Sequence, residues 1–311
     1  MVQFGQYPRP VHTVAHLSDP HLLAGGARQY GAIDPEAGLL LALDRLRRLD
    51  PVPDVVAFTG DLADRGEPAA YARLRELVDP VVADLGARVV WTMGNHDERA
   101  PYAAGLFGSS PDHDAVGPQD RAYDVRGLRV LALDTSVPGY HHGDLEDSQL
   151  DWLADQLVVP SEHGTLLALH HPPIPVPMLP VAAVIELQDQ HRLAEVVRGS
   201  DVRAIVGGHF HYTSWSTFAG IPVSVASASC YTADPAPLDR LISGVDGHQA
   251  FTVLHLYGDD ADRQVVHTVV PLAQAHEVSG HGLDVVPALE ALSPEERREV
   301  ISNKASDLNQ G

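Results

Sequence analysis

The chain has 311 residues, 44% hydrophobic and 20% charged, which suits one large α/β domain or two smaller ones with a buried core. Its net charge of −21 and the lack of a basic stripe argue against nucleic acid as a partner. No apolar run reaches the roughly 18 residues that span a bilayer. We expect no signal peptide, and the single cysteine, Cys230, favours a reducing compartment, so we expect the cytoplasm.

Five apolar runs with little alternation predict strands that are buried on both faces. They are residues 11–19, 54–61, 87–95, 165–171 and 202–209. Residues 122–135 differ, because two strand-like halves meet at Arg126 and Gly127 and predict a β-hairpin. Further strands without intervening helices are expected between residue 220 and about residue 272.

Helical patterns lie between these strands. Asp34 and Pro35 predict the N-cap and first residue of one helix. Further helices are expected over 68–85, 146–157 and 188–198. The alternation predicts an α/β fold with two mixed sheets rather than one doubly wound sheet. We expect one domain over residues 1–272 and a C-terminal tail over 273–311, with a short helix capped by Ser293.

Acids, amides and histidines directly follow the five predicted buried strands. In chain order they are Asp19 and His21, Asp61, Asn95, His170, and His209 with His211. Ligands bind outside the carboxyl ends of strands in open α/β sheets, so we expect these side chains to converge. Oxygen and imidazole donors without thiolate suit first-row metals. Seven donors are too many for one ion, but they suffice for two if one carboxylate bridges, an arrangement that recurs in phosphoryl transfer.

Each motif alone also has a plainer interpretation. Asp19-Pro20-His21 is typical of a turn, and Gly94-Asn95-His96-Asp97 is consistent with a β-turn. His209 and His211 would most often mark one face of a strand.

An extended backbone would point His209 and His211 the same way, about 6.5–7 Å apart, so that one segment reaches both ions. Gly207 and Gly208 would let that backbone come close beneath the metals.

The ordered motifs D-x-H, GD, GNHD, H and GHxH resemble the signature of the calcineurin-like metallophosphoesterases over residues 11 to about 230. The segments "LSDPHL", "GDLAD", "GNHDER" and "ALHHPP" further resemble class III cyclic nucleotide phosphodiesterases. The likeness is closest to the actinobacterial and mycobacterial 3′,5′-cyclic-AMP type, which also resembles bacterial glycerophosphodiesterases. The resemblance implies a catalytic domain built as a β-sandwich of two mixed sheets flanked by helices, in four αββα layers, and a homodimer.

The resemblance also implies a role for each candidate ligand. Asp61 would bridge the two ions. The first ion would be held by Asp19, His21 and His211, and the second by Asn95, His170 and His209. The ions would be iron and manganese, with zinc or cobalt as alternatives.

Residues beside the ligands have implied roles as well. His96 would hydrogen-bond to the phosphoryl oxygen or protonate the departing alkoxide without touching a metal. Asp64 and Asp97 would orient ligands or polarise His96. His171 would support the site or only pack beneath it. Two loop histidines, His141 and His142, are candidate substrate contacts, although exposed loop histidines often have no role.

These features together predict a phosphodiesterase that hydrolyses 3′,5′-cyclic nucleotides such as cAMP to 5′-nucleotides. A hydroxide bridging the two ions would attack phosphorus. Within enzymes, the alternative is a glycerophosphodiesterase or a broad phosphodiesterase that includes 2′,3′-cyclic nucleotides. A non-enzymatic alternative is a metal-binding scaffold with a degenerate site. The expected partner is a small phosphodiester, with neither nucleic acid nor an integral membrane segment.

Overall fold

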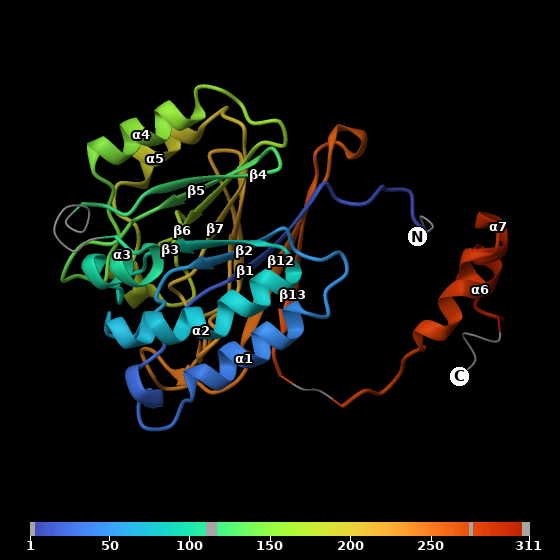
Figure 1. Cartoon of the computed structure of the whole chain (residues 1–311), viewed down its shortest axis with the longest axis horizontal. Helices are drawn as coiled ribbons and strands as arrows, with labels where there is room; N and C mark the ends of the chain where they lie inside the picture. Colours follow the sequence, from blue (N-terminus) through green and yellow to red (C-terminus); the bar gives the residue numbers. More distant parts are fainter. Residues whose placement is uncertain (1–3, 110–116, 274–275, 307–311) are drawn as a thin grey trace.

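The computed structural model describes residues 4–109, 117–273 and 276–306, and two β-sheets form its centre (Figure 1). The first sheet has the order β13-β12-β1-β2-β3. Its strands are β1 (His12–Leu17), β2 (Val55–Thr59), β3 (Arg88–Thr92), β12 (Ala250–Leu256) and β13 (Val265–Pro271). β1, β2 and β3 run parallel, whereas β12 and β13 are antiparallel additions, so the sheet is mixed.

The second sheet has the order β4-β5-β6-β7-β9-β8 and is also mixed. Its strands are β4 (Arg121–Val125), β5 (Leu128–Leu133), β6 (Thr165–Leu169), β7 (Val202–Gly207), β8 (Ser214–Phe218) and β9 (Ile221–Val225). β5, β6, β7 and β9 run parallel, while β4 and β8 form antiparallel edges. A separate two-stranded ribbon pairs β10 (Thr232–Ala233) with β11 (Gly244–Val245).

Helices cover the outer face of each sheet and complete the four predicted layers (Figure 1). These helices are α1 (Pro35–Leu46), α2 (Pro68–Leu85), α3 (Arg99–Phe107), α4 (Asp147–Leu157) and α5 (Gln190–Val197). Two further helices, α6 (Val286–Glu290) and α7 (Pro294–Arg297), lie in the C-terminal segment apart from the sheets (Figure 1). α1, α2 and α3 pack on the first sheet, and α4 and α5 pack on the second. The α/β sandwich of two mixed sheets is therefore confirmed.

Three apolar layers hold the sheets and helices together. One lies between the first sheet and its helices, and another lies between the second sheet and its helices. The third lies between the two sheets, where Val14 and Val90 of one sheet share a cluster with Val130 and Val206 of the other. Because both faces of the central strands are buried, they read in the sequence as continuous apolar runs.

Several local predictions are confirmed. The Asp34 side chain accepts a hydrogen bond from the Ala37 N–H group, so it caps α1 as expected. The hairpin β4–β5 turns at Arg126 and Gly127, both with positive φ. Ser293 caps α7 through a reciprocal capping box with Glu296. The division at residue 272 stays a prediction.

Helix α3 is missing from the predicted elements. It follows "GNHDE" directly and ends at Gly108, which adopts a left-handed conformation with φ 68°. No capping side chain bonds to its first turn, so the usual N-terminal signal is absent. Tertiary packing stabilises this helix, because Tyr102 and Leu106 are buried against the first sheet and α2.

No helix in the described residues is long and apolar enough to cross a membrane.

Replacing Leu43 by Ala should destabilise the protein by about 2–5 kcal/mol, because this α1 side chain is only 1% exposed and its loss leaves a cavity. Leu40 lies on the same helix but is 46% exposed, so Leu40→Ala is the matched control, with an expected change within about 0.5 kcal/mol. Urea denaturation measures both changes. Equal losses for the two variants would contradict the assignment of the buried face.

Candidate metal centre

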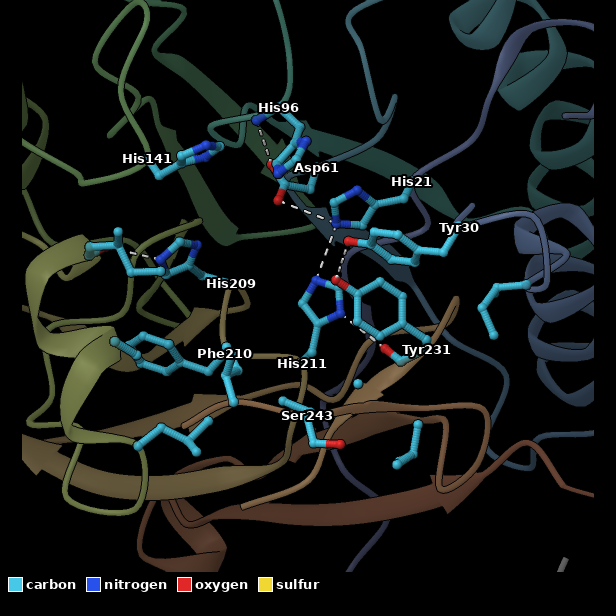
Figure 2. A pocket seen from close by; sticks show the side chains of 18 of the residues that line it. His21, Tyr30, Asp61, His96, His141, His209, Phe210, His211, Tyr231 and Ser243 are labelled. Carbon is cyan, nitrogen blue, oxygen red and sulfur yellow. Dashed lines mark hydrogen bonds and ion pairs between the residues drawn. The ribbon is translucent and has the colours of Figure 1, made fainter. Parts of the chain in front are cut away.

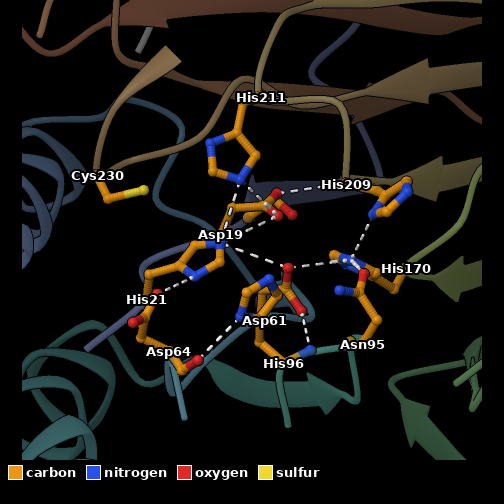
Figure 3. A network of polar contacts seen from close by, with 12 residues as sticks. Asp19, His21, Asp61, Asp64, Asn95, His96, His170, His209, His211 and Cys230 are labelled. Carbon is orange, nitrogen blue, oxygen red and sulfur yellow. Dashed lines mark hydrogen bonds and ion pairs between the residues drawn. The ribbon is translucent and has the colours of Figure 1, made fainter. Parts of the chain in front are cut away.

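The parallel strands of both sheets end at one edge of the sandwich, and the predicted ligands gather there (Figure 3). β1, β2 and β3 are followed by Asp19 and His21, by Asp61 and by Asn95. β6 and β7 of the other sheet are followed by His170 and by His209 and His211. The structure thus brings all seven predicted ligands together from five strand ends.

The first group of ligand atoms surrounds the Nε2 atoms of His21 and His211, which lie 3.1 Å apart. His211 Nε2 is 3.4 Å from Asp19 Oδ1, and His21 Nε2 is 3.4 Å from Asp61 Oδ2. All four side chains are buried, and their ligand atoms lie within 4.8 Å of one another. Donors that share one ion at about 2.0–2.2 Å are expected at such separations.

The second group surrounds His170 Nε2. It lies 3.1 Å from Asn95 Oδ1, 3.2 Å from His209 Nδ1 and 3.4 Å from Asp61 Oδ2. The same oxygen of Asp61 therefore faces a histidine of each group at the same distance. This is the arrangement that a carboxylate bridging two ions requires.

The outward nitrogens of these histidines already have partners. The Nδ1 atoms of His170 and His211 donate to the Thr59 and Tyr231 carbonyl oxygens, at 2.7 and 2.9 Å. His21 Nδ1 donates to Asp64 Oδ1 at 3.0 Å, and His209 Nε2 bonds to the Ile185 carbonyl oxygen at 2.9 Å. With those protons assigned, the inward nitrogens carry lone pairs that point toward one another in pairs.

These facing lone pairs fit bound cations. Two lone pairs 3.1 or 3.2 Å apart repel each other unless a positive charge lies between them. Among the described residues, Asp19 Oδ1 has no hydrogen-bond partner although Asp19 is 0% exposed, and burying a carboxylate oxygen without a hydrogen bond is costly. Cations in both groups would satisfy all of these atoms.

The backbone at the site is strained. Five of the seven predicted ligands have positive φ angles: Asp19 (51°), His21 (45°), Asp61 (50°), His209 (72°) and His211 (58°). Residues other than glycine rarely adopt this left-handed conformation, and such strain concentrates at functional sites. The prediction that His209 and His211 lie on an extended strand is wrong, because β7 ends at Gly207 and both residues lie in the turn beyond it.

Two glycines permit the close packing of these turns. A Cβ atom on Gly94 would lie 2.2 Å from the Asp61 backbone nitrogen, and one on Gly208 would lie 1.8 Å from Ser18 Oγ. Neither position can accept a side chain without moving a ligand-bearing turn. The expected close approach of the backbone is therefore present at Gly208.

Burial and charge act in opposition at the ligands. Burial alone would raise the pKa of Asp19, but the adjacent His211 lowers it to about 2. Burial alone would lower the pKa of His170, but the Asp61 carboxylate raises it to about 9. Burial lowers the pKa of His209 to about 3. The acids are thus held ionised and the His209 imidazole is held neutral, and these are the states in which carboxylates and imidazoles bind cations.

His96 lies beside the ligands. Its backbone N–H donates to Asp61 Oδ1 at 2.8 Å, and its Nδ1 donates to the Asp64 carbonyl oxygen at 2.9 Å. The ring faces the cavity at the site, so Nε2 is the nitrogen available to a ligand (Figure 2).

Asp97 is expected to orient ligands or to polarise His96, and its contacts favour the first of these roles. Its carboxylate accepts the N–H groups of Leu62, Ala63 and Gly94 and the hydroxyl of Tyr71, at 2.8–3.1 Å. Burial and the nearby Asp61 charge raise its pKa to about 6. Asp97 therefore ties together the loops that follow β2 and β3.

The two loop histidines differ in position. His141 lines the cavity, and its Nδ1 accepts a hydrogen bond from the Asn95 side-chain amide at 2.8 Å. His142 is absent from the lining and contacts the ring of Tyr140, so the structure does not bring it to the site. His171 is fully buried, bonding to the Thr135 hydroxyl and to the His141 carbonyl oxygen at 2.7 and 3.0 Å.

A cavity of about 550 Å³ opens at the ligands (Figure 2). This volume lies in the range of roughly 300–1,000 Å³ that is usual for small-molecule sites. Figure 2 shows His21, Asp61 and His96 at one end, with Phe210 and Tyr231 on opposite sides. Its remaining lining is mostly apolar, including Leu179, Ile185, Ile242 and Val245.

Sequence reasoning missed several residues that support the site. Gln29 donates its side-chain amide to Asp64 at 2.7 Å, and Tyr71 donates to Asp97 at 2.8 Å. Thr59 and Tyr231 act through backbone carbonyl groups, which leave no signal in side-chain identity.

The match to known families agrees with this geometry. Residues 12–213 match the calcineurin-like phosphoesterase family, and the chain belongs to that family. It is therefore a hydrolase of the metallophosphoesterase type.

Similar proteins support the same assignment. The chain is 50% identical over 273 residues to a cAMP/cGMP dual specificity phosphodiesterase of Mycobacterium tuberculosis, covering 88% of this chain and 83% of the relative. It is 47% identical to a probable cyclic nucleotide phosphodiesterase of Rhodococcus erythropolis, over 98% of both. A dimetal phosphatase from Danio rerio shares the fold with a TM-score of 0.59 at 17% identity, over 85% of this chain and 98% of that one.

Replacing Asp97 by Ala should destabilise the metal-free protein by about 3 kcal/mol or more, because three buried N–H groups lose their acceptor. Tyr71→Phe removes only one donor and should cost about 1–2 kcal/mol. Chemical denaturation in the presence of a chelator measures both without a contribution from metal binding. If Asp97→Ala were no worse than Tyr71→Phe, the proposed tie between the loops would be wrong.

Proposed function

We propose that this protein is a dinuclear metal phosphodiesterase that hydrolyses 3′,5′-cyclic nucleotides to 5′-nucleotides. The observation that carries this proposal is the position of Asp61 Oδ2, which lies 3.4 Å from a histidine nitrogen of each ligand group. Support for the substrate class comes from the two relatives at 47–50% identity, both named as cyclic nucleotide phosphodiesterases.

The seven candidate ligands divide into two sets that share one carboxylate. Asp19, His21 and His211 would hold the first ion, and Asn95, His170 and His209 would hold the second. Asp61 would bridge them. All of the donors are oxygen or imidazole nitrogen, which supports the assignment of iron and manganese, with zinc or cobalt as alternatives.

Two cations at this site would neutralise the phosphate oxygens and activate a water for attack on phosphorus. That neutralisation is needed because the chain carries a net charge of −21, which would otherwise repel an anionic substrate. The residues around the ligands keep them ready for this task, since each histidine is oriented through its outward nitrogen.

His96 would donate a proton to the leaving group. Its Nδ1 is occupied by the Asp64 carbonyl oxygen, which leaves Nε2 facing the cavity. When Nε2 is protonated, it can hydrogen-bond to the phosphoryl group and donate its proton to the departing ester oxygen. His141, held by Asn95, would contribute a second contact at the same edge of the cavity.

Two further assignments accompany this proposal. We place the protein in the cytoplasm, because its single cysteine, Cys230, is a buried free thiol and the proposed substrates are intracellular signals. A homodimer is proposed from the family resemblance.

The manganese-loaded protein should hydrolyse 3′,5′-cAMP with a kcat/KM at least about 10-fold above that for glycerophosphoethanolamine, because only the nucleotide fills the apolar part of the cavity. A parallel assay with 2′,3′-cAMP tests the broader alternative, and a chelator-treated sample is the control. A large preference for glycerophosphoethanolamine would replace the proposed function with the glycerophosphodiesterase alternative. Failure to hydrolyse even bis(p-nitrophenyl) phosphate would favour the scaffold.

His96→Ala should lower kcat by about 10²–10⁴-fold while both metal ions remain bound, because His96 is assigned a proton and no metal. Elemental analysis of the purified variant and steady-state kinetics measure the two effects. His191→Ala is the control, since this histidine is exposed on α5 and is not among the residues that line the cavity. Loss of metal from His96→Ala would contradict the assignment.

A further inference from the structure

Two tyrosines form one side of the cavity, and we call Tyr30 and Tyr231 the tyrosine wall (Figure 2). Their ring centroids are 5.6 Å apart with an interplanar angle of 79°, and their hydroxyl oxygens are 3.3 Å apart. Tyr30 is 81% exposed although it lines the cavity. Its aromatic ring is therefore accessible to a ligand that enters the cavity.

Tyr231 lies directly beside the candidate metal centre and contacts two of its histidines. Its carbonyl oxygen accepts the hydrogen bond from His211 Nδ1 at 2.9 Å. Its ring centroid is 4.5 Å from that of His211 and 6.4 Å from that of His21. A ligand whose phosphate lies at the metal ligands therefore has this ring within reach of its other end.

Tyr30 is placed by a strained turn that is tied to the same centre. It has φ 51° in a turn closed by pairing between Gln29 and Ile33. Gln29 donates to Asp64 at 2.7 Å, and Asp64 in turn accepts from the metal-ligand candidate His21. Backbone strain of this kind concentrates at functional sites, and here it accompanies an aromatic ring at the cavity.

The opposite side of the cavity is apolar. Phe210 faces the tyrosine wall across the cavity (Figure 2), and the lining also includes the aliphatic side chains of Leu179 and Ile185. Neither lysine nor arginine occurs among the described residues of the lining, so a second anionic group finds no partner there. A flat, uncharged heterocycle fits a space between aromatic and aliphatic surfaces, because its faces can stack.

We propose that the tyrosine wall is the nucleobase subsite, with the base stacked on one of the two nearly perpendicular rings and in edge contact with the other while the phosphate lies at the metal ligands. This inference deepens the proposed function and rests on it. It assigns substrate specificity to two residues that take no part in the chemical step. Stacking on an aromatic ring tolerates any base, so the subsite would recognise the presence of a base rather than its identity.

Calorimetric titration of the manganese-loaded protein with 5′-AMP and with ribose 5-phosphate tests the inference, because ribose 5-phosphate keeps the phosphate and carries a hydroxyl group in place of the base. The wild type should bind 5′-AMP at least about 10-fold more tightly. Tyr231→Ala and Tyr30→Ala should each weaken 5′-AMP binding by about 5- to 100-fold and leave ribose 5-phosphate unchanged. Tyr231→Phe and Tyr30→Phe should retain most of the preference, since they keep the ring.

Tyr140→Ala is the matched control, because Tyr140 is 62% exposed but absent from the cavity lining. Equal binding of the two ligands by the wild type would overturn the inference. So would alanine variants that keep the wild-type preference for 5′-AMP. If Tyr231→Ala loses metal, the binding measurements on Tyr30→Ala alone test the inference. The proposed function fails separately, if the protein does not hydrolyse 3′,5′-cAMP.

Discussion

The carboxylate oxygen shared between two histidine groups is the constraint on which the rest of this structure depends. Asp61 Oδ2 can face His21 on one side and His170 on the other only if the two sheets end at the same edge. The sandwich achieves this by packing the sheets through Val14, Val90 and their counterparts. A shift of one sheet against the other would separate the two groups, so the apolar layer between the sheets sets the geometry of the polar site above it.

Assembling that site has an unfavourable free energy, which contacts with the surrounding residues offset. Positive φ angles strain the backbone at five candidate ligands, and imidazole nitrogens of two histidine pairs face each other at 3.1 and 3.2 Å. Fixed hydrogen bonds offset this cost. The Thr59 and Tyr231 carbonyl oxygens hold two of the histidines, and the Asp97 carboxylate holds the loops beneath them. Rigid support of this kind allows a cluster of charged and imidazole side chains to form in a buried place. The same contacts extend outward through Asp64 and Gln29 to the turn that carries Tyr30.

Sequence patterns located the strands and most helices because burial on two faces and helical capping leave direct traces in residue order. They failed where a tertiary contact replaces a local signal. Helix α3 has no capping side chain, and its buried Tyr102 stabilises it instead. Asp97 stands beside His96 in sequence, yet it turns away to bind backbone N–H groups. His141 and His142 are neighbours, yet only His141 lines the cavity.

The sequence by itself determined which residue types follow the buried strands, and parallel strand ends made their convergence predictable. Only the tertiary structure decided how those residues face one another. The shared oxygen of Asp61 and the pairing of Tyr30 with Tyr231 both join segments that lie far apart in the chain. Local sequence restricts backbone conformation over a few residues, whereas these contacts arise from how two sheets and their loops pack in space.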